Sequence, residues 1–225
     1  MSAAKDVASL REMVNQMIAQ QAAAGPPPDY SGVKKSTVQV PVRDGSSIPT
    51  VVYQPDNASA PGPLVVLFHG GGFCIGIPEM EEALGLEIVR KFGGVALSVD
   101  YRLAPEHPFP GPTDDSFDAL KWAAANAKSL GADPSKGFII GGTSAGAIIS
   151  SVLSHQARDE KLSPPLTGVW LNVPHVVGQS VLPEKYRSIH TSQAQNSDAP
   201  ILDKKAIDFF YGTSIPTFLF LIISL

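Results

Sequence analysis

Four continuous apolar runs, separated by segments of helical length, constrain this chain more than any other feature of its sequence. A run that is apolar at nearly every position is typical of a strand buried on both faces, as in a parallel sheet covered by helices. The runs are PLVVLFHGGG, VALSVDY, GFIIGG and LTGVWLNV, and helices are expected between them over about 79–92, over about 113–130 and in AGAIISSVLSHQA. The alternation therefore predicts an α/β fold with a mostly parallel sheet and helices on both faces.

A hairpin and one helix are expected before these runs. STVQVPV and IPTVVYQP alternate apolar and polar residues around the turn RDGSS, which predicts two paired strands. Further upstream, Val7 and Leu10 lie on one helical stripe, and a capping box of Ser9 and Glu12 would place Val7 just before the helix. This helix is expected to end near Gly25, before GPPPDY, and either to dock on the domain surface or to form part of a lid over a pocket.

Composition limits the class of protein. The 225 residues include one cysteine and carry a formal net charge of −4, so an internal disulfide is excluded and nucleic acid is not an expected partner. The N-terminus lacks the apolar segment of a secretory signal, which favours a reducing, cytoplasmic location. The apolar stretch at 218–225 is shorter than the roughly 20 residues that a spanning helix needs, so no membrane span is expected. Neither a metal-ligand spacing nor a phosphate-binding loop occurs in the sequence, so no metal is expected.

A Gly-x-Ser-x-Gly motif at 142–146 follows an expected strand and precedes an expected helix. In a nucleophile elbow the strand-to-helix turn is so tight that small residues must flank the serine, here Gly142 and Gly146, and strain exposes the serine hydroxyl. The helix that follows adds a positive dipole end and free amides. Ser144 is therefore a candidate nucleophile, although the pentapeptide alone also fits an ordinary strand–glycine–helix turn.

A second glycine-rich loop favours a catalytic role for Ser144 over an ordinary turn. It follows an expected strand directly and consists of His69, Gly70, Gly71 and Gly72. Glycines let the backbone approach a ligand closely, and amides of this loop can form an oxyanion hole together with the amide of Ala145. Two such loops, in this order and at the ends of two strands, favour serine-based acyl chemistry over a merely flexible turn.

A third motif, DYRLAPEHPFP at 100–110, ends a strand and enters a proline-rich loop. Together with HGGGF at 69–73, GTSAG at 142–146 and APILDKKAIDFFYG, it makes the chain resemble the hormone-sensitive-lipase-like branch of the α/β-hydrolases, a group of carboxylesterases and lipases. The resemblance covers roughly residues 5–212. It implies an α/β-hydrolase fold with a helical cap and no cofactor.

The resemblance also implies a role for each motif residue. Ser144 would be the nucleophile, and the oxyanion hole would use the amides of Gly71, Gly72 and Ala145. His69 would orient the glycine loop rather than take part in the chemistry.

Neighbouring residues are expected to have structural roles. Arg102 and Glu106 would hold the YRLAPE loop by ion pairing. Cys74, beside the glycine loop, is expected to be a small buried hydrophobe rather than a reactive thiol.

The resemblance divides the chain into four parts. Residues 1–30 would form an N-terminal cap helix and linker, and residues 31–175 the α/β-hydrolase core. Residues 176–212 would form a cap insertion and a return helix over about 204–211, which Asp203 would cap. Residues 213–225 would form an apolar tail.

A nucleophilic serine needs a histidine base and an acid that orients the base, and in this fold both follow the serine along the chain. After Ser144 the sequence shows one clear strand, a polar segment and one short helix, so the sheet is expected to be incomplete at its C-terminal side, as in a truncated product. Of the later histidines, His155 should point away and His190 lies in the cap-like segment. His175, which follows LTGVWLNV, is the best substitute base, although a loop histidine is more often simply solvated.

Three interpretations follow. The first is a carboxylesterase-like or lipase-like serine hydrolase that cleaves uncharged acyl esters, impaired because the triad acid and base are missing. The second is a non-catalytic small-molecule-binding module on the same fold, and the third is a product that does not fold. A small ester is the expected partner, and the sequence specifies neither its acyl chain, nor its alcohol, nor the oligomeric state.

Overall fold

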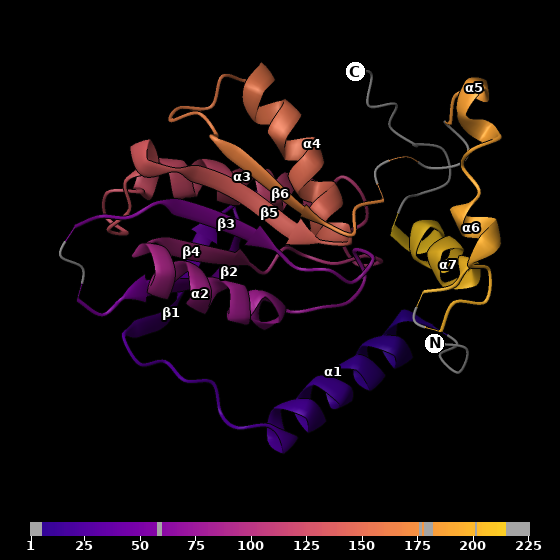
Figure 1. The fold of residues 1–225 in the computed structure, drawn as a ribbon, viewed down its shortest axis with the longest axis horizontal. Helices are drawn as coiled ribbons and strands as arrows, with labels where there is room; N and C mark the ends of the chain where they lie inside the picture. The colour runs from indigo at the N-terminus through magenta and orange to yellow at the C-terminus, as the bar shows by residue number, and fades with distance from the viewer. Residues whose placement is uncertain (1–5, 58–59, 176, 178–181, 201, 215–225) are drawn as a thin grey trace.

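The computed structural model describes residues 6–57, 60–175, 177, 182–200 and 202–214, and within them the centre of the fold is a six-stranded sheet in the order β1–β2–β4–β3–β5–β6 (Figure 1). β1 and β2 form an antiparallel hairpin, β2 is antiparallel to β4, and the other neighbours are parallel. The mostly parallel sheet that the sequence predicts is therefore confirmed. The strands are β1 Val33–Pro41, β2 Ser47–Pro55, β3 Leu64–Phe68, β4 Val95–Val99, β5 Phe138–Thr143 and β6 Gly168–Asn172.

Helices cover both faces of the sheet. α2 contacts β2 and β4 on one face, and α3 and α4 cover the other face (Figure 1). α1 and α5–α7 lie beyond the main body of the sheet, on the side where the parallel strands end (Figure 1). The helices are α1 Val7–Ala24, α2 Glu82–Phe92, α3 Gly111–Asn126, α4 Ala145–Asp159, α5 Glu184–Arg187, α6 Ser192–Gln195 and α7 Lys204–Ser214, with 3₁₀ turns η1 Pro78–Glu81 and η2 Pro134–Lys136.

Alternate residues of β3 explain why its sequence is apolar throughout. Val66 and Phe68 belong to the core that includes residues of α3 and α4. Val65 and Leu67 point to the opposite face, into the core that includes residues of α2. Because successive side chains of a strand point to opposite faces, a strand covered on both sides has no position for a polar residue.

β6 lies at one edge of the described sheet, beside β5, as the sequence predicts for LTGVWLNV. Its apolar side chains are largely uncovered: Val169 is 43% exposed, Trp170 40% and Leu171 37%. An uncovered apolar edge strand favours association between molecules.

Several boundaries differ from the expected ones. α1 begins at Val7 because Asp6 caps it, its Oδ1 accepting a hydrogen bond of 2.8 Å from the Ser9 amide, so the capping box of Ser9 and Glu12 is wrong. The helix expected over about 113–130 is α3, which begins at Gly111 and ends at Asn126.

The end of the return helix also differs. Asp203 caps α7 as expected, accepting from the Ala206 amide at 2.7 Å. The helix expected over about 204–211 continues through Ser214, while the apolar tail expected over 213–225 stays a prediction, since residues 215–225 lie outside the described residues. None of the helices in the described part of the chain has both the length and the apolarity to cross a bilayer.

Candidate active site

Ser144 occupies a strained turn between β5 and α4. Its backbone has φ 54° and ψ −112°, and its amide donates a hydrogen bond of 2.9 Å to the Asn172 carbonyl. A positive φ is unfavourable for a residue with a side chain and persists only where the surroundings enforce it. Neighbouring glycines make the turn possible, because a Cβ on Gly142 would lie 2.3 Å from the Phe68 carbonyl oxygen and one on Gly146 only 1.8 Å from it. The strained strand-to-helix turn that the motif predicts is therefore confirmed.

The second glycine loop lies directly beside this turn. A Cβ built on Gly70 would be 3.5 Å from the Cβ of Ser144. Gly71 and Gly72 have φ of +127° and +60°, positive values that favour glycine. In the described part of the chain, the amides of Gly71, Gly72 and Ala145 donate no hydrogen bond to the protein. The two motifs, about 70 residues apart in sequence, thus meet at the carboxyl ends of β3 and β5.

His69 is a structural part of this loop. Its ring stacks on Tyr101 with 4.3 Å between centroids, and its Nδ1 lies 2.8 Å from the Gly70 carbonyl oxygen. The Tyr101 hydroxyl donates to the His69 carbonyl at 2.7 Å. Burial lowers the pKa of His69 to about 4, so the ring is neutral at pH 7. A fully buried neutral ring, fixed by its own loop and by Tyr101, supports an orienting role.

Ion pairs hold the YRLAPE loop, as expected. Arg102 binds Asp115 through two side-chain hydrogen bonds of 2.8 and 2.6 Å, and its third nitrogen donates to Asp44 at 2.6 Å. Asp115 also accepts from the Arg102 backbone amide at 3.1 Å. Glu106 pairs instead with Arg11 of α1.

Replacing Asp115 with asparagine is expected to lower the free energy of unfolding by about 2 kcal/mol. The Asp115 side chain is 1% exposed, so the change leaves the Arg102 guanidinium without its buried counter-charge. Because the Arg102 side chain is itself 26% exposed, solvent reduces the expected loss of stability below that of a fully buried pair. Urea denaturation measures the difference. Asp159→Asn, which breaks an exposed pair with Arg158, is the matched control and should leave the midpoint unchanged. Equal midpoints for both variants would contradict the structural role of the pair.

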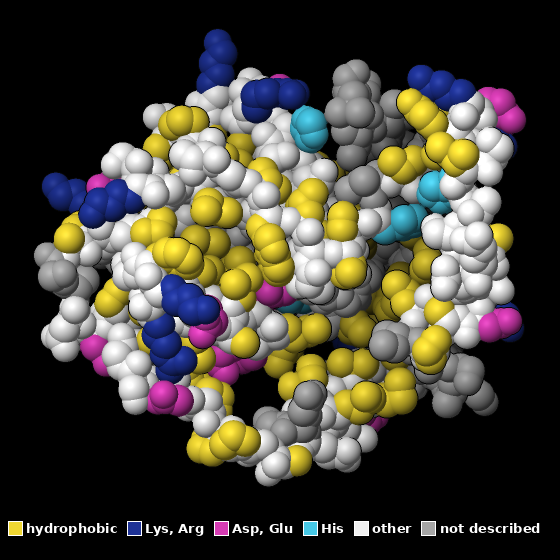
Figure 2. All heavy atoms as spheres, viewed as in Figure 1, with side chains coloured by type: hydrophobic (Ala, Val, Ile, Leu, Met, Phe, Trp, Pro, Cys, Tyr) yellow, Lys and Arg dark blue, Asp and Glu magenta, His cyan; other side chains and the backbone are white. Residues whose placement is uncertain are grey.

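An apolar cluster joins α1 and α7 to the glycine loop. Phe210 of α7 lies against Gly72, since a Cβ built on that glycine would be 2.4 Å from the ring. Hydrophobic side chains gather where α1 faces α7 (Figure 2). Burial raises the pKa of Cys74 to about 11, which supports its expected role as a buried hydrophobe rather than a thiolate. The buried members of the cluster are Val7, Leu10, Cys74, Ile75, Ala104 and Phe210.

His175, the candidate substitute base, is engaged elsewhere. Its Nδ1 lies 2.5 Å from the Tyr211 hydroxyl, and its Nε2 lies 3.2 Å from the Gln193 amide nitrogen. All five histidines of the chain lie in its described part, and none of them hydrogen-bonds to Ser144 there. Among the described residues, the structure therefore does not bring a histidine base to the candidate nucleophile.

Two features of the site escaped the sequence analysis. Glu81, at the end of η1, is 5% exposed and interacts with the hydroxyl of Thr143, the residue before Ser144; burial raises its pKa. Arg11 of α1 donates to the carbonyls of Cys74 and Ala104 at 2.6 and 2.5 Å, which ties α1 to both loops. Neither residue belongs to a motif with a known spacing, so no sequence signal could have identified it. Within the described residues, no group of three or more His, Cys, Asp or Glu side chains could hold a metal ion.

Comparison with known proteins gives a consistent family. A family model described as "alpha/beta hydrolase fold" matches residues 65–218. The chain is 40% identical over 186 residues to "AB hydrolase superfamily protein B1A11.02" of Schizosaccharomyces pombe, a match that covers 82% of this chain and 55% of that protein. It is 39% identical over 171 residues to "Carboxylesterase NlhH" of Mycobacterium tuberculosis, covering 76% and 50%. The chain thus spans about half the length of the curated relatives that it matches.

Solved structures agree with this family. EstE1, a carboxylesterase from a metagenomic library, superimposes with a TM-score of 0.80 at 32% identity, and the match covers 96% of this chain and 69% of EstE1. Vibralactone cyclase superimposes with a TM-score of 0.85 at 32% identity, covering 95% and 64%.

Proposed function

Because the chain belongs to the α/β-hydrolase family, in its hormone-sensitive-lipase-like branch, we propose that it is a carboxylic ester hydrolase whose nucleophile is Ser144. The observation that carries the proposal is the strained backbone of Ser144 beside the glycine loop. The Cβ of Ser144 lies 3.5 Å from the position that a Cβ on Gly70 would take. Strain of this kind, beside a glycine loop with positive φ, presents a hydroxyl and backbone donors to one point in space.

The chemistry would proceed by acyl transfer. The Ser144 hydroxyl attacks the ester carbonyl, and the negative charge that develops on the carbonyl oxygen is bound by the amides of Gly71, Gly72 and Ala145. Those amides donate no other hydrogen bond in the described residues, which supports this role. His69 keeps the loop in place through its ring stack on Tyr101.

The acyl group would lie in apolar surroundings. α1 and residues 182–214 would form the cap over the site, since the apolar cluster around Phe210 joins both to the glycine loop. Such surroundings suit uncharged acyl esters of small molecules rather than charged ones.

The histidine base and its acid partner are not among the described residues that surround Ser144. A neutral serine hydroxyl is a weak nucleophile at pH 7, so the chain would work poorly without them. The same observation favours a second candidate function, a non-catalytic module that binds a small ester beside Ser144 and the glycine loop.

A chimera tests the role of Ser144 directly. The part of the S. pombe relative that follows its match to this chain would be joined after Ser214, and hydrolysis of short-chain aryl esters would be measured. If Ser144 is the nucleophile, the chimera should gain turnover that falls at least about 10³-fold in its Ser144→Ala variant.

Ser151→Ala is the matched control, because Ser151 lies further along α4, away from the strained turn, and its loss should not affect turnover. A chimera that melts cooperatively and hydrolyses esters equally well with and without Ser144 would exclude the serine as nucleophile. A folded chimera that binds esters without turnover would favour the binding module.

A further inference from the structure

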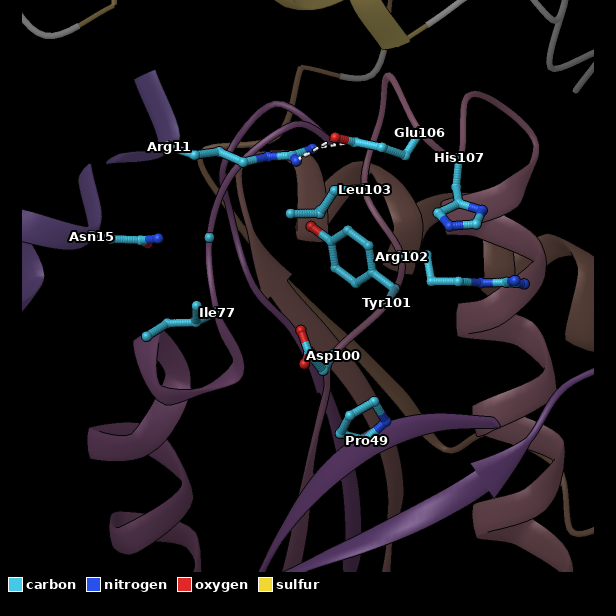
Figure 3. A pocket seen from close by; sticks show the side chains of 11 residues that line it. Arg11, Asn15, Pro49, Ile77, Asp100, Tyr101, Arg102, Leu103, Glu106 and His107 are labelled. Atoms are coloured by element: carbon cyan, nitrogen blue, oxygen red, sulfur yellow. Dashed lines mark hydrogen bonds and ion pairs between the residues drawn. The ribbon is translucent and has the colours of Figure 1, made fainter. Parts of the chain in front are cut away.

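A pocket of about 420 Å³ lies between α1 and the loop that follows β4, and Ser144 does not line it (Figure 3). Its walls come from four parts of the chain that are distant in sequence, one of them β2 through Pro49. Asn15 lies on the α1 side, Ile77 on the segment after the glycine loop, and Asp100 to Leu103 on the loop after β4 (Figure 3). The volume falls within the range of small-molecule sites, about 300–1,000 Å³.

The two arginines at this pocket are already neutralised. Arg11 donates to both carboxylate oxygens of Glu106, at 2.8 and 2.7 Å, and uses its remaining nitrogen to reach a backbone carbonyl. Arg102 points away from the cavity in Figure 3 and is bound by Asp115 and Asp44. Each guanidinium is therefore already paired with at least one carboxylate, so the positive charge at this pocket is largely balanced.

Asp100 is the charge without a counter-charge. Its side chain points into the cavity in Figure 3, and in the described part of the chain it makes no hydrogen bond or ion pair. Burial raises the pKa of the Asp100 carboxyl, and the nearby Glu79 raises it further. Glu79 has Lys35 as a partner at 3.6 Å, whereas no ion pair among the described residues includes Asp100. A partly buried carboxylate of this kind is stabilised by a cation that approaches it.

A second polar group faces Asp100 across the cavity. The Asn15 side chain points from α1 toward the pocket in Figure 3, and among the described residues it has no hydrogen-bond partner. Its amide oxygen accepts hydrogen bonds, as the carboxylate of Asp100 does. The apolar side chains of Pro49, Ile77 and Leu103 also line the pocket and suit a short hydrocarbon chain. The remaining lining residues are Gly76, Tyr101 and His107.

From this arrangement we infer that the pocket binds a small organic cation, an alkylammonium or alkylguanidinium group, with its charge at Asp100, a hydrogen bond to Asn15 and its alkyl part against Ile77 and Leu103. This site goes beyond ester hydrolysis, and it does not depend on it. A bare metal ion fits the lining poorly, because the described residues offer no cluster of three His, Cys, Asp or Glu ligands there.

Titration of the full chain with n-butylguanidinium at pH 7 and constant ionic strength tests the inference. Binding is measured by calorimetry and located by amide chemical-shift changes, which should concentrate at residues 11–15, 76–77 and 100–107. Neutral butyramide and anionic butyrate are the ligand controls, and each should bind at least about tenfold more weakly than the cation.

Two variants address the residues. Asp100→Asn should weaken n-butylguanidinium binding by about tenfold or more while keeping the fold, since it removes an uncompensated charge. Asn15→Leu, on the opposite wall, should also weaken n-butylguanidinium binding, because it removes the proposed hydrogen bond without touching Asp100. Glu87→Gln is the matched control: it removes an exposed carboxylate of α2 that pairs with Lys91, and it should leave the affinity unchanged.

Three results would overturn the inference. One is equal binding of the cation and of butyramide, another is shift changes outside the pocket, and the third is undiminished affinity in both Asp100→Asn and Asn15→Leu. Loss of affinity in Glu87→Gln equal to that in Asp100→Asn would show a general effect of net charge and would also count against the site.

Discussion

Replacing Gly146 with alanine is expected to lower the free energy of unfolding by at least about 3 kcal/mol. The added Cβ would lie 1.8 Å from the carbonyl oxygen of Phe68 and 2.5 Å from its carbonyl carbon. These are backbone atoms at the end of β3, which pairs with β4 on one side and β5 on the other, so they cannot move without disturbing two registers. Overpacking a core costs typically about 1–3 kcal/mol, and a clash with the backbone of a central strand belongs at or above the top of that range.

Gly212→Ala provides the matched control. Gly212 lies within α7, and a Cβ built on it meets no atom within 4 Å. Alanine at an unobstructed helical position should raise the free energy of unfolding by about 0.5–1 kcal/mol. Urea denaturation of both variants measures the two effects, and a Gly146→Ala variant as stable as the wild type would mean that the elbow does not lie against β3 as the structure has it.

The fold and the position of Ser144 were predictable because their signals are local. A run such as LVVLF is typical of a strand buried on both faces, and a glycine on each side of Ser144 is typical of a turn too tight for larger residues. Order along the chain then placed the glycine loop of β3 and the turn after β5 at the same edge of the sheet.

The contacts that fix the site depend on long-range geometry and were not predictable. Arg11 reaches the Cys74 carbonyl across 63 residues of sequence and the Ala104 carbonyl across 93. No periodicity or spacing connects such partners, because the pairing arises only when α1 docks beside both loops. The same holds for the unpaired Asp100, because the motif that it begins gives no indication of which side chains lie around its carboxylate.

Helix ends were missed for a different reason. The capping residue of α1 is Asp6, three positions before the predicted Ser9, and both are residue types that cap helices, so sequence alone does not say which one the helix uses. The end of α7 was placed too early because Gly212 usually favours termination, yet here it continues the helix to Ser214.

The 225-residue chain is expected to hydrolyse short-chain aryl esters about 10⁶-fold more slowly than a serine hydrolase with its full triad. In a serine protease, removal of the serine or the histidine lowers turnover by about that factor, while oxyanion binding and positioning retain roughly 10³–10⁴ over water. None of the five histidines hydrogen-bonds to Ser144 in the described residues, and His175 lies against Tyr211 and Gln193 instead.

If no base acts on Ser144, the Ser144→Ala variant should change turnover little, because the oxyanion donors are backbone amides that the substitution leaves in place. The assay compares purified wild-type and variant chains with carboxylesterase NlhH as the active reference. Turnover of the wild-type chain near that of the reference, lost in the Ser144→Ala variant, would show that a base does reach the serine. His175→Ala would then be the first substitution to make, since only a rearrangement that frees this ring from Tyr211 could supply the proton acceptor.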